Sequence, residues 1–390
     1  HGGICLNYVK VVELIKDNFG KLCGVKAKDS LTGEEYKIKT KLIVNATGVF
    51  VDDVMKMDAP ESKKKVRPSQ GVHLVVDSKF LGGNSALMIP KTKDGRVLFG
   101  VPWHGKAVLG TTDTPLTDSS LEPRALEEEV DFILDQAGQY LDLKPTRADV
   151  LSVFAGLRPL AAPTHSDSKK TKEISRSHKI YKSESGLLTI TGGKWTTYRE
   201  MAEDAVNVGI KMAELPIHEC VTKNLKVHGY AKNVDDSTWS YVYGSDVENI
   251  KAIIKENPAN AELLHPKFTF NVAHVIWAAR EEMAESVEDV LARRARALFL
   301  DARAAMEMAP KVAKIMAVEM NKSKEWEEAQ VNSFVSLANE YILHTPVSNS
   351  PAHDKLKTPG EKAPKYKEEI QKNSNITESD IPTETWKAMD

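Results

Sequence analysis

Alternating apolar and polar residues dominate the first fifty residues of the chain. Residues 5–16 and 21–29 show this alternation, and residues 34–48 show it again after the turn sequence SLTGE. A period of two is typical of strands that bury one face. The sequence therefore predicts three β-strands that pair with one another. The last of them ends in the apolar run LIVNA and then Thr47-Gly48, as a buried parallel strand does where it meets a ligand crevice.

A second β region follows a short helix and the charged loop ESKKK. Residues 71–77, 86–90, 96–103 and 107–113 are apolar segments separated by turn sequences, and together they predict an antiparallel meander. Residues 121–141 have the period of an amphipathic helix, with Pro123 in its first turn. Residues 150–163 predict a further strand, which we expect Pro159 to terminate.

The hydrophobic period changes to that of helices in the second half of the chain. A buried strand, GLLTIT, leads through Gly-Gly-Lys into an amphipathic helix over 198–214. Beyond residue 229, segments 271–284, 286–300, 302–320 and 326–343 all predict helices, and Ser286 with Asp289 forms a capping-box signature. From about residue 348 the sequence is rich in Lys, Pro and Glu and predicts a loose tail.

Composition restricts the classes of function. The 390 residues are 41% hydrophobic, enough for about two or three domains with cores of their own. A net charge of -2 gives no general attraction to nucleic acid. The three cysteines form no CxxC or Cys/His cluster, which argues against a zinc site or a disulfide scaffold and suits a reducing compartment. No apolar run approaches the roughly 20 residues of a membrane-spanning helix.

The junction GGKWT raises a candidate binding site. Gly192 and Gly193 allow a close approach of backbone to a ligand, and the free N–H groups of a helix start favour an anion or a polar carbonyl edge. Lys194 adds a full charge and Thr196 a hydroxyl group. The alternative is an ordinary strand-to-helix turn capped by threonine.

Three further positions are candidates for chemistry. Arg158, in AGLRPL, ends a predicted core strand; a structural role is the commoner outcome there, but with Lys194 it could clamp a phosphate. His73 follows a glycine at the start of a strand, where a core histidine is the usual outcome and acid–base work the alternative. The segment from Gly110 to Asp113, GTTD, is interpreted as a turn.

Two basic runs, 63–65 and 169–179, are interpreted as solvated loops. Their charge also allows contact with an anionic membrane surface, as an alternative. No spacing indicates a metal site, a Walker loop or a Ser-His-Asp arrangement.

Five blocks in this order resemble the FAD-dependent glycerol-3-phosphate dehydrogenase and oxidase family, within the D-amino-acid-oxidase-like flavoproteins. They are KLIVNATGVFVDDVMKMD, VRPSQGVHLVV, VLFGVPWHGKAVLGTTDTPL, VFAGLRPL and LTITGGKWTTYREMAEDAV. The helical end, with SVEDVLARRARALFLD, is similar to the C-terminal domain of that family. The resemblance extends to about residue 345.

The resemblance implies a role for each matching residue. Thr47 and Gly48 match residues that contact FAD. His73 matches a histidine near the flavin ring and is the implied catalytic base, and Arg158 and Lys194 match residues that bind the substrate phosphate. The turn packed against the flavin is matched by Gly192, Gly193, Lys194, Trp195 and Thr196.

The implied reaction is oxidation of sn-glycerol 3-phosphate to dihydroxyacetone phosphate, with hydride transfer to FAD and final electron transfer to a quinone or to oxygen. The implied location is cytoplasmic, peripheral on the inner face of the cell membrane. The implied fold is α/β plus α: a partial FAD-binding Rossmann-like domain (1–58, resumed at 181–214), an antiparallel-sheet substrate or cap domain (59–180), a C-terminal helical domain (228–346) and a tail (347–390).

The family's GxGxxG turn, which binds the ADP part of FAD, is not found in this sequence, so we expect an N-terminally truncated member. Two alternatives therefore stay open. One is a related flavoenzyme that acts on an amine or amino acid, which the pairing of Arg158 with Lys194 disfavours. The other is a non-catalytic fragment whose helical end is an interaction module. The sequence does not decide the electron acceptor or the oligomeric state.

Overall fold

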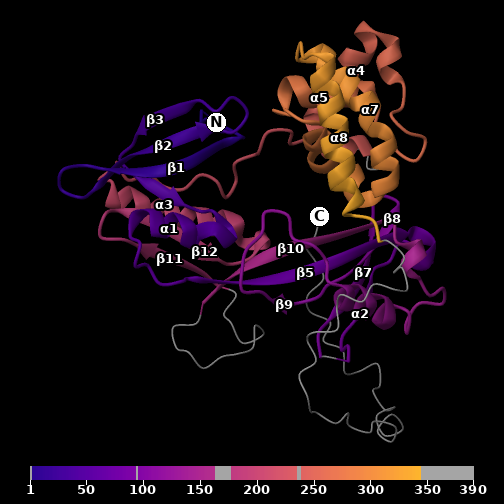
Figure 1. Cartoon of the computed structure of the whole chain (residues 1–390), viewed down its shortest axis with the longest axis horizontal. Helices are drawn as coiled ribbons and strands as arrows, with labels where there is room; N and C mark the ends of the chain where they lie inside the picture. The colour runs from indigo at the N-terminus through magenta and orange to yellow at the C-terminus, as the bar shows by residue number, and fades with distance from the viewer. Residues whose placement is uncertain (1, 94, 163–176, 235–238, 344–390) are drawn as a thin grey trace, which may run out of the picture. The chain divides into compact units, whose positions relative to one another are not determined.

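The computed structural model describes residues 2–93, 95–162, 177–234 and 239–343. The predicted tail from residue 347 and most of the basic run at 169–179 lie outside these ranges. Within them the chain forms three sheets and a set of C-terminal helices (Figure 1). The predicted α/β-plus-α class is confirmed.

The N-terminal sheet is antiparallel, with strands in the order β1-β2-β3. Its strands are β1 (Val9–Lys16), β2 (Leu22–Asp29) and β3 (Glu35–Lys39). This part matches the prediction, except that the expected third strand divides into β3 and a separate strand, β4 (Ile43–Asn45). β4 belongs to a different sheet.

The second sheet joins segments that are far apart in the sequence. Its order is β11 (His178–Lys182), β12 (Leu187–Gly192) and β4, and β12 runs parallel to β4 with Thr189 opposite Asn45. Helices α1 (Val51–Asp58) and α3 (Tyr198–Met212) contact β12. β11 crosses the predicted domain boundary at 180/181, because all its pairing is with β12.

The third sheet has six strands. They are β5 (Val66–Asp77), β6 (Leu87–Ile89), β7 (Leu98–Trp103), β8 (Lys106–Gly110), β9 (Thr114–Pro115) and β10 (Ser152–Ala161). The order is β10-β5-β8-β7-β6, with β9 beside β5. The predicted meander is therefore correct for β6, β7 and β8, but β5 pairs with β8 and β10 rather than with the strand that follows it.

One face of this sheet is covered by α2 (Glu127–Ala137). Its core contains the fully buried Val72, Leu74, Leu109 and Ile133. The helix begins after Pro123, so the prediction that placed this proline in the first turn is wrong. The opposite face of the sheet carries His73 and Arg158, as described below.

Pro159 does not terminate β10, contrary to the prediction. It lies within the strand, directly opposite Pro68 of β5. Proline has no backbone N–H to donate to a neighbouring strand. Because the two prolines face each other, no other residue at this position is left with an unpaired N–H. β10 is also an edge strand, where proline is tolerated.

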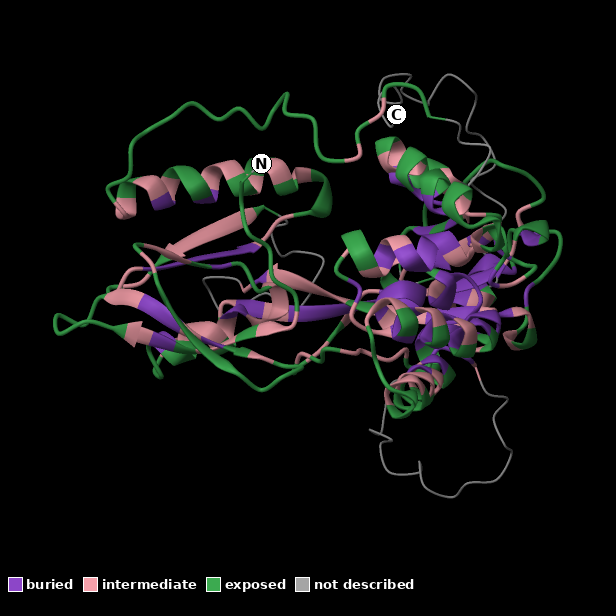
Figure 2. Ribbon diagram, turned by 90° about the horizontal axis from the view of Figure 1, so that it is seen from above, coloured by how far each residue is buried: buried purple, intermediate pink, exposed green. Residues whose placement is uncertain are grey.

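The C-terminal helices follow the predicted segments closely. They are α4 (Val247–Glu256), α5 (Val272–Glu281), a π-helix η8 (Asp289–Arg294), α6 (Ala297–Leu300), α7 (Ala302–Glu319) and α8 (Lys324–Asn339). Sequence reasoning missed α4. The core between these helices is rich in buried alanine and methionine, and the helices of Figure 2 carry much of the buried colour. Asp289 accepts a hydrogen bond from Tyr8, ahead of β1.

Within the described ranges, no helix combines the length and the apolar character needed to cross a bilayer. In the same residues, no three His, Cys, Asp or Glu side chains gather as a metal site would require.

The central strand β5 should be the most sensitive part of the third sheet. Leu74 is completely buried, so the substitution Leu74→Ala removes a full side chain from the core and is expected to lower the free energy of unfolding by about 2–5 kcal/mol. Chemical denaturation measures this. The control is Met88→Ala in the same sheet: Met88 is 54% exposed, and we expect a change of about 0.5 kcal/mol or less. Equal losses for both variants would contradict the assigned core.

Candidate functional site

The carboxyl ends of the parallel strands β4 and β12 lie next to each other. Thr47 and Gly48 follow β4, and Gly192 ends β12. In α/β sheets the carboxyl ends of parallel strands are where ligands bind. The predicted cofactor residues, Thr47, Gly48 and residues 192–196, therefore come from two turns at one sheet edge, which the sequence separates by more than a hundred positions.

Asn45 attaches the first of these turns to strand β12. Its buried amide donates to the carbonyl oxygen of Val51 (2.9 Å) and to Oγ1 of Thr189 (3.3 Å). Its Oδ1 accepts the hydroxyl of Thr47 (2.7 Å). A buried amide with its groups satisfied fixes the backbone around it. The residue was not singled out from the sequence, although a polar residue within an apolar strand was a usable signal.

The two glycines of the second turn have conformations that favour glycine. Gly192 has φ of 78° and Gly193 has φ of 76°. A Cβ on Gly193 would lie 2.5 Å from Sδ of Met201, which is closer than real contacts. Gly48 also has a positive φ, 63°, and a Cβ there would meet nothing within 4 Å. Its backbone thus faces open space.

The three residues after the glycines are exposed. Lys194, Trp195 and Thr196 lie where the chain enters a short 3₁₀ turn ahead of α3. Trp195 is 83% exposed and stacks on Tyr198, with ring centroids 5.3 Å apart. An exposed lysine and an exposed indole at a turn are available to a ligand.

His73 lies on the third sheet, on the face away from α2. Its ring stacks on Phe154 of β10, at 5.2 Å between centroids and 18° between planes. On the other side Gly110 of β8 is its register partner, and a Cβ there would overlap the imidazole. Burial lowers the pKa of His73 to about 4, and the nearby positive charge of Arg158 adds to that lowering. The imidazole is therefore neutral at pH 7.

Arg158 lies on the same face, four residues along β10 from Phe154. Its guanidinium donates to the carbonyl oxygen of Thr112 (3.2 Å) and to Oγ1 of Thr111 (3.0 Å), and it is 3.6 Å from the carboxylate of Asp113. A Cβ on Gly71 would overlap the guanidinium, so this side chain lies directly across β5. The side chain remains about one third exposed.

A network behind Arg158 holds the GTTD segment. Asp113 accepts the hydroxyl of Ser69. Glu129 of α2 is almost completely buried, and its carboxylate accepts from Thr112 (2.8 Å), Thr114 (2.5 Å) and Gln70 (2.7 Å), and from one backbone N–H. Sequence analysis interpreted GTTD as a plain turn and missed its contact with Arg158. The acidic run that contains Glu129 was the available signal.

A hollow of about 450 Å³ opens beside Arg158. Thr111, Thr112 and Asp113 line it, together with the exposed ring of Phe99. Arg158 thus lines a cavity, and His73 lies on the same sheet face without lining it. Phe99 was not predicted.

β10 links this face to the glycine turn. The strand passes Phe154 beside His73, then Arg158, and ends at Ala161, whose Cβ lies 3.5 Å from the position of a Cβ on Gly192. β10 also contacts the 3₁₀ turn that follows Thr47. The two groups of predicted residues are therefore adjacent in the fold and joined by β10, although Arg158 and Ala161 point to opposite faces of that strand. Together they offer a ligand a neutral imidazole, a cation and a turn of two glycines.

Comparison with family models accounts for most of the chain. The model described as "FAD dependent oxidoreductase" matches residues 1–199, and the one described as "C-terminal domain of alpha-glycerophosphate oxidase" matches residues 188–330. The first match contains all the predicted site residues.

Similar full-length proteins are named glycerol-3-phosphate dehydrogenases. The chain is 38% identical to a mitochondrial one of Arabidopsis thaliana, over 87% of this chain and 58% of that protein. It is 35% identical to that of Homo sapiens, over 88% of this chain and 50% of the relative. The chain thus spans between about half and three fifths of the length of these relatives.

A solved structure has the same fold. The glycerol-3-phosphate dehydrogenase of Bacillus halodurans, solved in complex with FAD, superposes with a TM-score of 0.75 at 30% identity. The match covers 88% of this chain and 71% of that one. On these matches, the chain belongs to the FAD-dependent oxidoreductase family, in the branch that carries the C-terminal domain of α-glycerophosphate oxidase.

Proposed function

We propose that this chain carries the substrate-binding part and one side of the cofactor site of an FAD-dependent glycerol-3-phosphate dehydrogenase. The reaction is oxidation of sn-glycerol 3-phosphate to dihydroxyacetone phosphate. The observation that carries the proposal is the pairing of His73 with Arg158 on one sheet face, where Arg158 lines a hollow and β10 leads on to the glycine turn. The names of the relatives support the choice of substrate.

The residues present fit one side of a flavin. Gly48 has open space where a side chain would be, and Gly192 and Gly193 keep the backbone bare at the adjacent strand end. We assign Thr47, Gly48 and the turn Gly192–Thr196 to holding the cofactor, with Trp195 beside it. When bound, FAD would accept the hydride of the alcohol oxidation, which carries both electrons.

Each side chain has a separate task in the proposed mechanism. Arg158 and Lys194 bind the phosphate of the substrate by charge-assisted hydrogen bonds. Asp113 and the carbonyl oxygen of Thr112 hold the guanidinium in place, so that the substrate is oriented before reaction. His73 is neutral, so one imidazole nitrogen can take the proton of the alcohol. Phe154 keeps water from one face of that ring.

A quinone or oxygen as the final electron acceptor, and a cytoplasmic, peripheral position at the inner face of the membrane, are parts of the same proposal. The names of the relatives place those proteins in mitochondria.

The direct test is an absorption spectrum of the purified chain after addition of FAD and desalting. We expect retained flavin bands that bleach when glycerol 3-phosphate is added without oxygen, and no bleaching with D-alanine or glycine. Bleaching by the amino acids alone would replace the proposed substrate. A colourless protein would contradict cofactor binding by this chain.

Binding of phosphate beside Arg158 should raise the pKa of His73. The folded-state pKa is about 4, below the ordinary 6.5, so protonation is shifted to lower pH and the neutral form persists down to about pH 5. A bound phosphate dianion offsets the positive charge of Arg158, which is the smaller cause of the lowered pKa. Burial of His73, the larger cause, remains. We expect an upward shift that stays below 6.5. NMR titration of imidazole nitrogens with and without inorganic phosphate measures it, and the shift should vanish in Arg158→Gln.

Substrate affinity should depend on the planar shape of Arg158. Arg158→Lys keeps the charge but loses the two hydrogen bonds that orient the group, so Kd for glycerol 3-phosphate is expected to rise about 10- to 100-fold. Calorimetry measures this without flavin turnover. The matched control is Arg147→Lys, whose partners Glu127 and Asp131 lie on α2; it should leave Kd unchanged. Equal effects of the two variants would refute the assigned site.

A further inference from the structure

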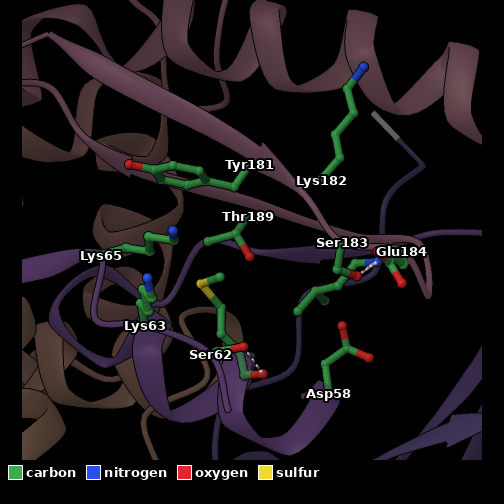
Figure 3. A pocket seen from close by; sticks show the side chains of 11 residues that line it. Asp58, Ser62, Lys63, Lys65, Tyr181, Lys182, Ser183, Glu184 and Thr189 are labelled. Atoms are coloured by element: carbon green, nitrogen blue, oxygen red, sulfur yellow. Dashed lines mark hydrogen bonds between the residues drawn. The ribbon is translucent and has the colours of Figure 1, made fainter. Parts of the chain in front are cut away.

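A second hollow, of about 300 Å³, lies at the other end of β12 from the glycine turn (Figure 3). It is lined from α1 and the following loop by Met55, Asp58, Ser62, Lys63 and Lys65, and from the β11–β12 hairpin by residues 181–184, Leu187 and Thr189. None of its lining residues belongs to the candidate functional site. It includes Lys63 and Lys65 of the basic run 63–65, for which the sequence predicts a solvated loop.

Two ammonium groups point into this hollow. Figure 3 shows the side chains of Lys63 and Lys65 on the same side of the hollow, with the methyl group of Thr189 turned toward them and its hydroxyl toward the middle of the hollow, whereas Lys182 points away. The backbone of Lys65 is fixed on both sides. Its N–H donates to Asp52 (2.8 Å), and its carbonyl oxygen accepts the N–H of Ala162 (2.7 Å).

The side chain of Lys65 is held as well. Its Nζ lies 5.0 Å from the ring centroid of Tyr181, within the range of a cation–π contact. Tyr181 and Thr189 are register partners across β11 and β12, so they occupy one face of the sheet. The cation is thus half-buried against a ring instead of moving freely in solvent.

Thr189 adds a buried hydroxyl group. The residue is only 1% exposed, and its Oγ1 accepts the amide of Asn45 at 3.3 Å. An oxygen that accepts from Asn45 directs its own hydrogen elsewhere, and Figure 3 shows the hydroxyl turned toward the hollow.

The carboxylates of the hollow do not cancel these cations. Asp58 is 3.0 Å from Lys16 and accepts the hydroxyl of Ser185, so its charge is already neutralised. Asp58 and Glu184 are drawn on the opposite side of the view from Lys63 and Lys65 (Figure 3). Met55 and Leu187 supply apolar wall between the two ends.

We propose that this hollow binds a phosphate monoester as a second, non-catalytic site. The phosphate lies between the ammonium groups of Lys63 and Lys65 and accepts the hydroxyl of Thr189. The organic part extends past Met55 toward Ser62 and Ser183, whose hydroxyls suit a small polyol or sugar. Two cations and one O–H donor match a dianion better than a carboxylate. The phosphate monoester can be a free metabolite or the headgroup of a lipid.

The test uses the full chain with Arg158→Gln throughout, so that phosphate binding at the candidate functional site does not contribute. Calorimetry with ribose 5-phosphate in 150 mM KCl compares this background with the added pair Lys63→Gln and Lys65→Gln. The matched control adds Lys64→Gln and Lys56→Gln, which remove the same charge from exposed neighbours outside the hollow.

We expect one binding site, weakened at least 30-fold by the Lys63 and Lys65 pair and less than threefold by the control pair. Equal weakening by both pairs would overturn the proposal, because diffuse surface charge would then explain binding. Unchanged thermal unfolding midpoints without ligand exclude a folding defect as the cause. Since Arg158 is already replaced, these results are independent of the proposed function.

Vesicles identify the source of the phosphate. Binding to phosphatidic acid vesicles that needs Lys63 and Lys65, and that ribose 5-phosphate does not reproduce, would assign the site to a lipid headgroup. Binding of ribose 5-phosphate alone would assign it to a free metabolite. Absence of both kinds of binding would overturn the proposal.

Discussion

The antiparallel pairing of β5 with β10 positions most of the candidate site. Its register runs without interruption from Ser152 opposite Val75 to Ala161 opposite Val66. It sets Phe154 beside His73 and carries Arg158 across Gly71. A slip of one residue would turn each of these side chains to the other face, toward α2 and its apolar core. Burial of the apolar face against α2 therefore also fixes the register of the face that carries His73 and Arg158.

A buried charge supports this arrangement from beneath. Glu129 brings a carboxylate into the region between α2 and the sheet, where an unpaired ion is very costly. Four donors surround it, and two of them are the hydroxyls of Thr112 and Thr114. The segment that holds Arg158 is thereby attached to a helix on the far side of the sheet. The orientation of the guanidinium of Arg158 therefore also depends on α2, which does not line the hollow.

Local pattern alone predicted most strands and most helices of this chain. It also selected His73, Arg158 and the Gly192–Gly193 turn, because glycines at a strand end and charged residues within apolar runs are visible in one dimension. Their proximity was not predictable from spacing: the order β10-β5-β8-β7-β6 is set by non-local pairing. The same holds for Pro159, whose tolerance depends on the residue opposite. Asn45 and Glu129 were missed because their bonds to Thr189 and Gln70 join elements that only the fold brings together.

Two glycines of the third sheet limit how sequences with this fold can vary. Gly71 and Gly110 leave the space that Arg158 and His73 occupy, and neither has a positive φ that would itself demand glycine. At Gly71 only the guanidinium of Arg158 would exclude the Cβ of an alanine, whereas at Gly110 the backbone carbonyl oxygen of Val72 would exclude it together with the imidazole of His73. A natural sequence with this fold and a larger residue at either position has had to redirect the arginine or the histidine. These two positions can therefore serve as markers, in any collection of such sequences, for members that have changed their chemistry while keeping their fold.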